Sequence, residues 1–259
     1  MKIASFNING VKARLPALLD WLREAEPDVV ALQEIKSTDD QFPRLEIEEL
    51  GYNIETHGQK GFNGVAILSK APLEDVVRGL PGAEEDDQAR WIEATVAGAR
   101  PTRICGLYLP NGNPAPGPKY DYKLGWMDRL RLRAEALLAK ESPALLLGDF
   151  NVIPQNEDCW DPAVWAEDAL FLPPTRSAYH RLTNLGLADA LRVVNANPGV
   201  YTFWDYQAGA WPKNKGIRID HVLMTPEAAD LLQACGVDAE IRGRDKPSDH
   251  VPIWVELAI

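Results

Sequence analysis

Short apolar segments, rich in β-branched residues and bounded by polar ones, recur along the whole chain. Their length and composition are typical of largely buried β-strands. The predicted strands cover residues 2–7 (KIASFN), 28–34 (DVVALQE), 64–68 (GVAIL), 103–109 (RICGLYL), 144–149 (ALLLGD) and 219–224 (IDHVLM).

Two other segments place their apolar residues at helical spacing. Residues 15–25 carry leucines at positions 15, 18, 19 and 22, and Pro27 ends the pattern, which predicts an amphipathic helix. Residues 123–140 keep one apolar face from Met127 to Leu138 and lead directly into the strand at 144–149.

The remaining segments add no sign of a second domain. Weaker helical patterns cover residues 226–234 and parts of 178–194, and the Pro- and Gly-rich stretch 110–119 is predicted to be a loop. Strands and helices are mixed over the whole length, with no long Ser/Gly linker between them. We therefore expect one α/β domain that spans residues 1–259.

Polar side chains follow three of the predicted strands where each strand ends. Asn7 ends the first strand and Glu34 ends the second, whereas Asp149 and Asn151 follow the leucines at 145–147. In open α/β sheets the carboxyl ends of the strands form the rim at which ligands bind. The sequence therefore predicts a functional site at this rim.

Three further polar residues precede strands. Asp220 begins the strand DHVLM, and Asp249 and His250 come just before VPIWVEL. If these two strands run antiparallel to the first three, their beginnings lie at the same rim. All of these side chains would then meet in one cleft.

Such a set of side chains is suited to a hard divalent cation. Carboxylate and amide oxygens, without thiolates or a histidine cluster, favour Mg²⁺ or Mn²⁺ over zinc. Hydrolysis of a phosphodiester requires a group that activates water, a cation for the developing charge and donors to the phosphate oxygens. Asp, Glu, Asn, His and Tyr can supply these functions.

Composition limits the class of protein. The 259 residues are 46% hydrophobic and 25% charged, which is ordinary globular composition. Cys105, Cys159 and Cys235 show no CxxC spacing and are interpreted as packing thiols. Neither a secretory leader nor a run long enough for a membrane span is evident, so we expect a cytoplasmic protein with no membrane association.

The net charge of −11 taken alone argues against a nucleic-acid partner, but the charges are unevenly distributed. Acid is concentrated at residues 39–49 and 84–93, whereas 211–218 (WPKNKGIR) has three basic residues and no acidic ones. Further basic segments are 58–61, 129–133 and 241–246. One cationic face is compatible with this pattern, and so is scattered solvated charge.

Each candidate residue also has a simpler interpretation. Glu34 can be a solvated acid or a helix cap, Asp149 and Asn151 can shape a turn, and Asp249 can cap a neighbouring segment. His57 and His180 have no partner in the sequence and are interpreted as structural. The order of the motifs along the chain distinguishes between these simpler interpretations and a shared functional site.

The series FNING, LQE, YLPN, GDFN, RIDHVL and SDH, with each piece at a strand boundary, resembles the endonuclease/exonuclease/phosphatase superfamily. Longer segments are similar to the bacterial exonuclease III family, which also contains apurinic/apyrimidinic endonucleases. They are LQEIKSTDDQFP (32–43), HGQKGFNGVAILSK (57–70) and TFWDYQAGAWPKNKGIRIDHVL (202–223). The similarity covers essentially the whole chain.

The resemblance implies a four-layer α/β sandwich, with two mixed β-sheets packed face to face and helices outside. It also implies a Mg²⁺-dependent hydrolase that cuts duplex DNA 5′ to abasic sites and removes 3′ nucleotides or 3′ blocking groups. No obligatory protein partner is indicated. Two alternatives are a relative that acts on RNA or another phosphoester, and a non-catalytic DNA-binding relative; the filled catalytic positions argue against the latter.

By motif position, the resemblance assigns Glu34 and Asn7 to the metal and Asp249 to a second metal contact. Asp149 orients or deprotonates the attacking water, and Asn151 holds phosphate or water beside it. His250, paired with Asp220, donates to a nonbridging phosphate oxygen that Tyr108 also approaches. An alternative scheme makes Asp149, Asn151 and His250 the ligands of a second metal ion.

The resemblance also places the DNA-binding and lesion-binding residues. Phe203, Trp204, Ile217 and Ile219 match the region that forms a dry pocket for a base-free sugar, although core packing is the simpler interpretation of the two aromatic residues. Lys213, Lys215 and Arg218 are expected to contact phosphates. Asn9 is expected near the metal, and some relatives carry aspartate at this position. Asn111 is expected near the DNA backbone, and some relatives carry glutamine there.

Overall fold

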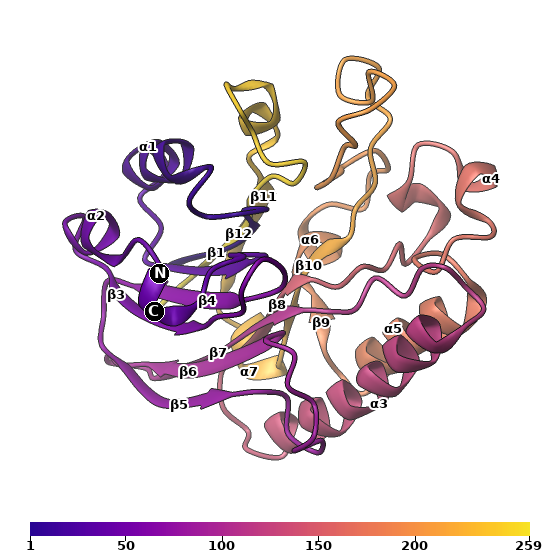
Figure 1. Ribbon diagram of the computed structural model, residues 1–259. Coiled ribbons are helices and arrows are strands. Elements are labelled where there is room, and N and C mark those ends of the chain that lie inside the picture. The colour runs from indigo at the N-terminus through magenta and orange to yellow at the C-terminus, as the bar shows by residue number, and fades with distance from the viewer.

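The computed structural model describes residues 1–259 and contains two mixed six-stranded β-sheets. The first sheet has the strand order β11-β12-β1-β2-β4-β3 and the second has the order β5-β6-β7-β8-β10-β9 (Figure 1). The strands of the first sheet are β1 (Lys2–Asn7), β2 (Val29–Gln33), β3 (Asn53–His57), β4 (Val65–Ser69), β11 (Leu232–Val237) and β12 (Ile253–Leu257). Those of the second sheet are β5 (Leu73–Arg78), β6 (Trp91–Val96), β7 (Thr102–Tyr108), β8 (Ala144–Asp149), β9 (Ala188–Asp189) and β10 (Asp220–Met224).

The longer helices cover the outer faces of both sheets. The helices are α1 (Leu15–Ala25), α2 (Arg44–Glu48), α3 (Pro118–Leu138), α4 (Pro162–Trp165), α5 (Pro173–Asn184), α6 (Ala190–Val194) and α7 (Pro226–Ala229), with 3₁₀ turns at Asp39–Gln41, Asn156–Asp158 and Ala239–Gly243. Helices α1 and α2 pack on the first sheet, and α3 and α5 pack on the second (Figure 1). No helix combines the length and the apolar character that crossing a membrane would need.

Three apolar layers hold these elements together, which confirms the expected four-layer sandwich. The central layer joins the two sheets, for example through Ile3 and Val29 of the first sheet and Leu145 and Val222 of the second. The outer layers join each sheet to its helices. Strands such as β2, β4 and β8 are buried on both faces, so their sequences are continuously apolar instead of alternating.

The strand directions bring the predicted site residues to one rim. Strand β1 runs parallel to β2, and β7 runs parallel to β8, whereas β12 is antiparallel to β1 and β10 is antiparallel to β8. Asp220 at the start of β10 is the direct register partner of Asp149 at the end of β8. The antiparallel arrangement on which the predicted cleft depends is therefore present.

Two secondary-structure predictions differ from the structure. The helix expected at 226–234 ends at Ala229, and residues 232–237 form strand β11 instead. Pairing with β12 at the sheet edge determines this conformation, because tertiary pairing outweighs local helical spacing. Helix α3 begins at Pro118 and not at residue 123, since the fixed φ of proline suits the first turn of a helix.

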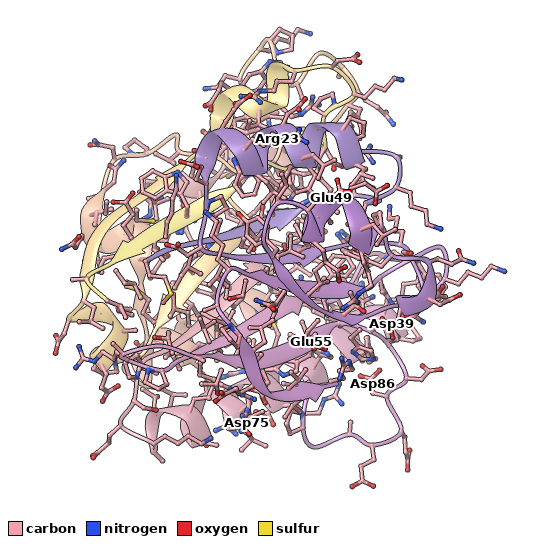
Figure 2. The ribbon with its side chains drawn as sticks, turned by 90° about the vertical axis from the view of Figure 1, so that its left-hand side faces the viewer. Arg23, Asp39, Glu49, Glu55, Asp75 and Asp86 are labelled. Carbon is pink, nitrogen blue, oxygen red and sulfur yellow. The ribbon has the colours of Figure 1, made fainter.

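Several acidic side chains lie on the side of the molecule where the edge strands β3 and β5 lie. Figure 2 shows Asp39, Glu49, Glu55, Asp75 and Asp86 on this side, together with the basic Arg23.

The basic segment 129–133 does not form a free cationic face. Its arginines pair with acids: Arg129 with Asp86, Arg131 with Asp128, and Arg133 with Glu93. The segment 211–218 lies in the long loop before β10.

Candidate active site

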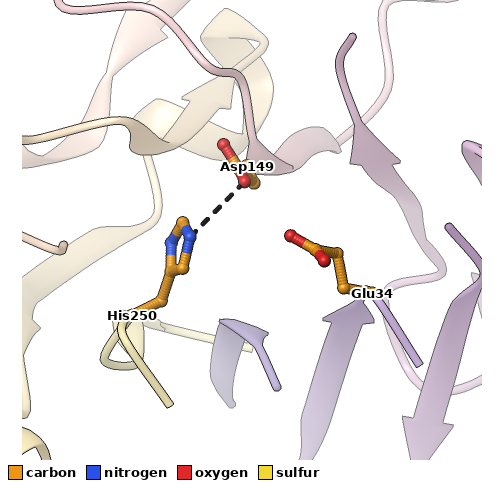
Figure 3. A group of neighbouring side chains, drawn as sticks. All are labelled: Glu34, Asp149 and His250. Carbon is orange, nitrogen blue, oxygen red and sulfur yellow. Dashed lines mark ion pairs between the residues drawn. The ribbon is translucent and has the colours of Figure 1, made fainter. Parts of the chain in front are cut away.

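Glu34, Asp149 and His250 converge at the rim of the two sheets (Figure 3). Glu34 follows β2, Asp149 ends β8, and His250 lies in the loop before β12. Their ligating atoms all lie within 4.8 Å of one another, and His250 Nε2 is 3.7 Å from Asp149 Oδ2. Carboxylates from both sheets therefore meet at one point, as a shared divalent cation requires.

Asn7, at the end of β1, connects the two carboxylates. Its Nδ2 donates to Glu34 Oε1 and to Asp149 Oδ2, each at 3.0 Å. Its Oδ1 accepts from the main-chain N–H of Asn9 at 3.0 Å, and Asn9 Nδ2 donates to Asp249 Oδ1 at 3.0 Å. One hydrogen-bonded chain thus joins the predicted metal residues.

His250 is fixed by Asp220. The Nδ1 of His250 is 2.8 Å from Asp220 Oδ2, and both side chains are buried. Burial alone would lower the pKa of His250, but the nearby carboxylates of Asp220 and Asp149 outweigh it and raise the pKa to about 10. The imidazole is therefore charged at neutral pH, and Nε2 can donate into the cleft.

The two clustered carboxyls differ in their protonation. Burial raises the pKa of Asp149 above its usual range, although the His250 imidazolium opposes this effect. Burial would also raise the pKa of Glu34, but hydrogen bonds from Asn7 and Lys36 lower it. Glu34 is therefore the more readily ionised of the two, and Asp149 is the better proton acceptor near neutral pH.

Tyr108 lies at the end of β7, beside the same carboxylates. Burial, followed by the charges of Glu34 and Asp149, raises the pKa of Tyr108 well above its usual value. The Arg90 guanidinium stacks 4.8 Å from the centroid of the tyrosine ring. Tyr108 therefore keeps its proton and can act as a hydrogen-bond donor.

Asn151 and Asn111 form the side of the cleft next to Asp149. The main-chain N–H of Asn151 donates to Asp149 Oδ1 at 2.9 Å, and Asn111 Nδ2 donates to Asn151 Oδ1 at 3.2 Å. Asn9, Glu34 and Asn151 all have left-handed backbone conformations, with φ of 47°, 49° and 48°. Asparagine adopts this conformation readily, whereas it is unusual for glutamate.

An apolar wall closes the other side of a cavity of about 200 Å³. Phe203, Ile217 and Ile219 line it, and the ring of Phe203 lies 5.0 Å from that of His250. The sequence analysis missed two further wall residues, Trp165 and Leu170. They belong to α4 and the segment after it, where no motif distinguishes a wall residue from ordinary packing.

Two predicted lesion or DNA contacts are wrong. Trp204 does not line the cavity but packs in the outer core of the first sheet, 4.9 Å from Trp211. Arg218 is 1% exposed and pairs with Asp158 and Asp189 instead of reaching DNA. In extended segments successive side chains point to opposite sides, so Phe203 and Ile217 face the cleft while their neighbours face the core.

The other sequence-predicted residues have varied positions. Lys213 is exposed, with its Nζ donating to Ala208 O at 2.9 Å, whereas the Nζ of half-buried Lys215 lies 4.3 Å from the centroid of the Trp160 ring. His57 Nδ1 lies 3.1 Å from Trp91 O, and His180 packs against Tyr179 in α5, so both are away from the site. All three cysteines are free.

The cleft combines a cation site, a proton acceptor, charged and neutral donors, and an apolar wall. Together these groups can activate water and bind a phosphate, which is the chemistry of a phosphodiester hydrolase.

Comparisons with known proteins agree with this class. A model of the Endonuclease/Exonuclease/phosphatase family matches residues 4–250. The chain is 37% identical over 268 residues to exodeoxyribonuclease III of Haemophilus influenzae, which covers 99% of this chain and 100% of that protein. The structures of an AP endonuclease from Archaeoglobus fulgidus (TM-score 0.95, 36% identity) and of the 3′ phosphatase NExo from Neisseria bound to a product DNA hairpin (TM-score 0.96, 37% identity) each match over 100% of both chains. The chain therefore belongs to the endonuclease/exonuclease/phosphatase family, as the motifs implied.

Proposed function

We propose that this protein is a DNA-repair phosphodiesterase that hydrolyses duplex DNA 5′ to abasic sites and processes 3′ ends, with Mg²⁺ or Mn²⁺ as cofactor. The convergence of Glu34, Asp149 and His250 in one cleft carries the proposal. The full-length relatives include an exodeoxyribonuclease, an AP endonuclease and a 3′ phosphatase, which supports DNA as the substrate. The whole chain, 1–259, acts as a single domain in this proposal.

Glu34 is the principal ligand of the cation, with Asn7 and Asp249 close to it. The donor set fits a hard cation because it consists of carboxylate and amide oxygens, and the pKa of Glu34 is lowered, so the ligand is ionised at neutral pH. When bound, the ion supplies positive charge to the phosphate oxygens. Asn9 orients Asp249 through the hydrogen bond between their side chains.

Asp149 accepts the proton of the attacking water, because burial raises its pKa toward the range of an effective general base. Asn151 holds Asp149 through its main-chain N–H and presents its side chain to the phosphate or the water. His250, charged and fixed by Asp220, donates from Nε2 to a nonbridging oxygen, and Tyr108 donates to the same phosphate.

The alternative scheme has a second metal ion at Asp149, Asn151 and His250. In that scheme the neutral imidazole of His250 would bind the ion through Nε2, because Asp220 holds Nδ1. In the proposal His250 is assigned as a donor, and the carboxylates of Asp220 and Asp149 support its charged form.

The apolar wall selects the lesion. Phe203, Ile217 and Ile219 offer no hydrogen-bond partner to a base, whereas a base-free sugar can enter a cavity of about 200 Å³ with apolar sides. Asn111, at the edge of the cavity, contacts the DNA backbone beside the cleaved bond.

The proposed activity is tested on gels with purified protein and three end-labelled substrates: an abasic duplex, a 3′-recessed duplex and an RNA duplex. We expect incision of the first and shortening of the second with Mg²⁺, and neither with EDTA. Preferential cleavage of RNA would identify a relative with a different substrate. Binding of DNA without cleavage in any metal would identify a non-catalytic relative.

We expect Lys213→Ala combined with Lys215→Ala to weaken DNA binding, because the protein carries a net charge of −11 and its loop lysines offset the repulsion locally. The plot of log K against log salt should flatten by about 0.9 per lost phosphate contact, or about 2 for both. Fluorescence anisotropy with a duplex at several salt concentrations measures the slope. The matched control is Lys70→Ala with Lys140→Ala, which removes two exposed lysines elsewhere; an equal slope for both double variants would contradict the prediction.

A further inference from the structure

Lys123 is completely buried in α3, although it carries a charge-bearing side chain. Its Nζ donates to the carbonyl oxygen of Asn111 at 2.9 Å and to that of Asn151 at 2.6 Å. Both partners are main-chain groups of the cleft, and neither is a carboxylate. A buried lysine is costly unless its donors are satisfied, so these two bonds determine the position of the side chain.

The loop after β7 is shaped to fit the lysine. Gly112 has φ of +91°, and a Cβ atom at this residue would lie 2.6 Å from Cδ of Lys123. The main chain therefore passes directly over the lysine stem with no room for a side chain. This contact holds the loop that contains Asn111 against α3.

The second carbonyl belongs to a residue of the site with a left-handed backbone. Asn151 has φ of 48°, a conformation that asparagine adopts more readily than most residues other than glycine. Its carbonyl accepts from Lys123, while its N–H donates to Asp149 Oδ1 at 2.9 Å. The main chain of Asn151 thus connects Lys123 to Asp149, the proposed general base.

The two asparagines are also connected to each other. Asn111 Nδ2 donates to Asn151 Oδ1 at 3.2 Å, and Asn151 Nδ2 donates to Leu109 O at 2.9 Å. With Lys123 beneath both main chains, these bonds form a closed network that leaves little freedom to either amide.

We infer that Lys123 is a positioning residue for the reaction: it clamps the main chains of Asn111 and Asn151 and thereby fixes the side of the cleft that holds Asp149 and the phosphate. The inference rests on the proposed function. It adds a residue from a helix outside the sheets to a site built from strand ends.

The clamp does not depend on the charge of the lysine. Burial lowers the pKa of Lys123 to about 7, but the neutral amine still has two N–H donors for its two carbonyl partners. Replacement by methionine removes both donors while keeping a long apolar stem. Glutamine restores N–H donors on a side chain that is one bond shorter.

The test measures steady-state kinetics on a 3′-recessed duplex. We expect Lys123→Met to lower kcat by about 10- to 100-fold, as loss of a supporting hydrogen bond behind a catalytic group does, with KM within about twofold. Lys123→Gln should recover part of the lost kcat. Lys140→Met, which removes an exposed lysine just beyond the far end of α3, should keep wild-type kinetics.

A wild-type kcat for Lys123→Met would overturn the inference, and so would an effect confined to KM. If the wild-type protein itself cleaves no DNA, the proposed function fails instead. If the variants do not fold, the inference is tested by NMR of the unmodified protein labelled with ¹⁵N-lysine. The Nζ signal of Lys123 should shift when product DNA fills the cleft, and an unresponsive signal would overturn the inference.

Discussion

Asp149→Asn is expected to lower kcat by about 100- to 10,000-fold, the range attributed to a general base. Asparagine has nearly the same shape and can still accept the hydrogen bond from the main chain of Asn151, but it cannot accept a proton from water. The apolar wall and the loop lysines are unchanged. DNA affinity should therefore stay close to that of the wild type.

Single-turnover cleavage of an abasic duplex with Mg²⁺ measures the chemical step, and anisotropy in EDTA measures binding. Glu167→Gln is the matched control, because it neutralises an exposed carboxylate in the segment beside the cleft wall. Undiminished cleavage by Asp149→Asn would remove Asp149 from the mechanism. Loss of binding together with cleavage would assign it to the support of the cleft instead.

His250→Ala is expected to lower kcat by about 100- to 1,000-fold, the usual cost of removing one donor to a developing charge. The donor is the imidazolium held by Asp220, and it exists below the raised pKa of about 10. Wild-type activity on a 3′-recessed duplex should therefore fall as the pH rises through about 10. The low residual activity of His250→Ala should lack this alkaline limb.

Rates measured from pH 6 to 11 provide the comparison. His180→Ala serves as the control, since this histidine packs against Tyr179 in α5 and makes no contact with the cleft. An alkaline limb that persists in His250→Ala would assign the titration to another group. On the acidic side, activity should rise with pH as Asp149 loses its proton, because burial places the pKa of this carboxyl above its usual value.

The direct action of Asp149 and His250 on the phosphate explains why these two effects should exceed the others. Asp149 and His250 face each other at 3.7 Å and would act on the same phosphate from the two sheets. Lys213, Lys215 and Lys123 act on binding or on position, so their loss removes none of the reacting groups.

The sequence was sufficient for the elements that build the rim. Runs such as ALLLGD are too short for a typical core helix and are typical of strands buried on both faces, and the polar residue that ends each run then lies at the sheet edge. The motif order was sufficient to identify Asn7, Glu34, Asp149, Asp220 and His250 as one set. The structure brings all five together.

Side-chain direction outside regular strands was not predictable. Ile217, Arg218 and Ile219 are adjacent in a loop whose sequence does not reveal its extended conformation, and alternation along it sends Arg218 to a buried pair with Asp158 and Asp189. The same alternation places Trp204 in the core and Phe203 in the cleft. A motif match assigns residues to a region but does not say which way each side chain points.

Local pattern predicted strands β1, β2, β4, β7, β8 and β10, helices α1 and α3, and the polar residues at the rim, because burial on one or both faces leaves a trace in the sequence. It did not predict strands β3, β5, β6 or β11. Tertiary structure alone decided the secondary structure of residues 226–234. It also decided the cavity wall formed by Trp165 and Leu170, and the burial of Lys123 against the main chains of Asn111 and Asn151. Each of these depends on partners distant along the chain. The contacts that decide them leave no periodic trace in the local sequence.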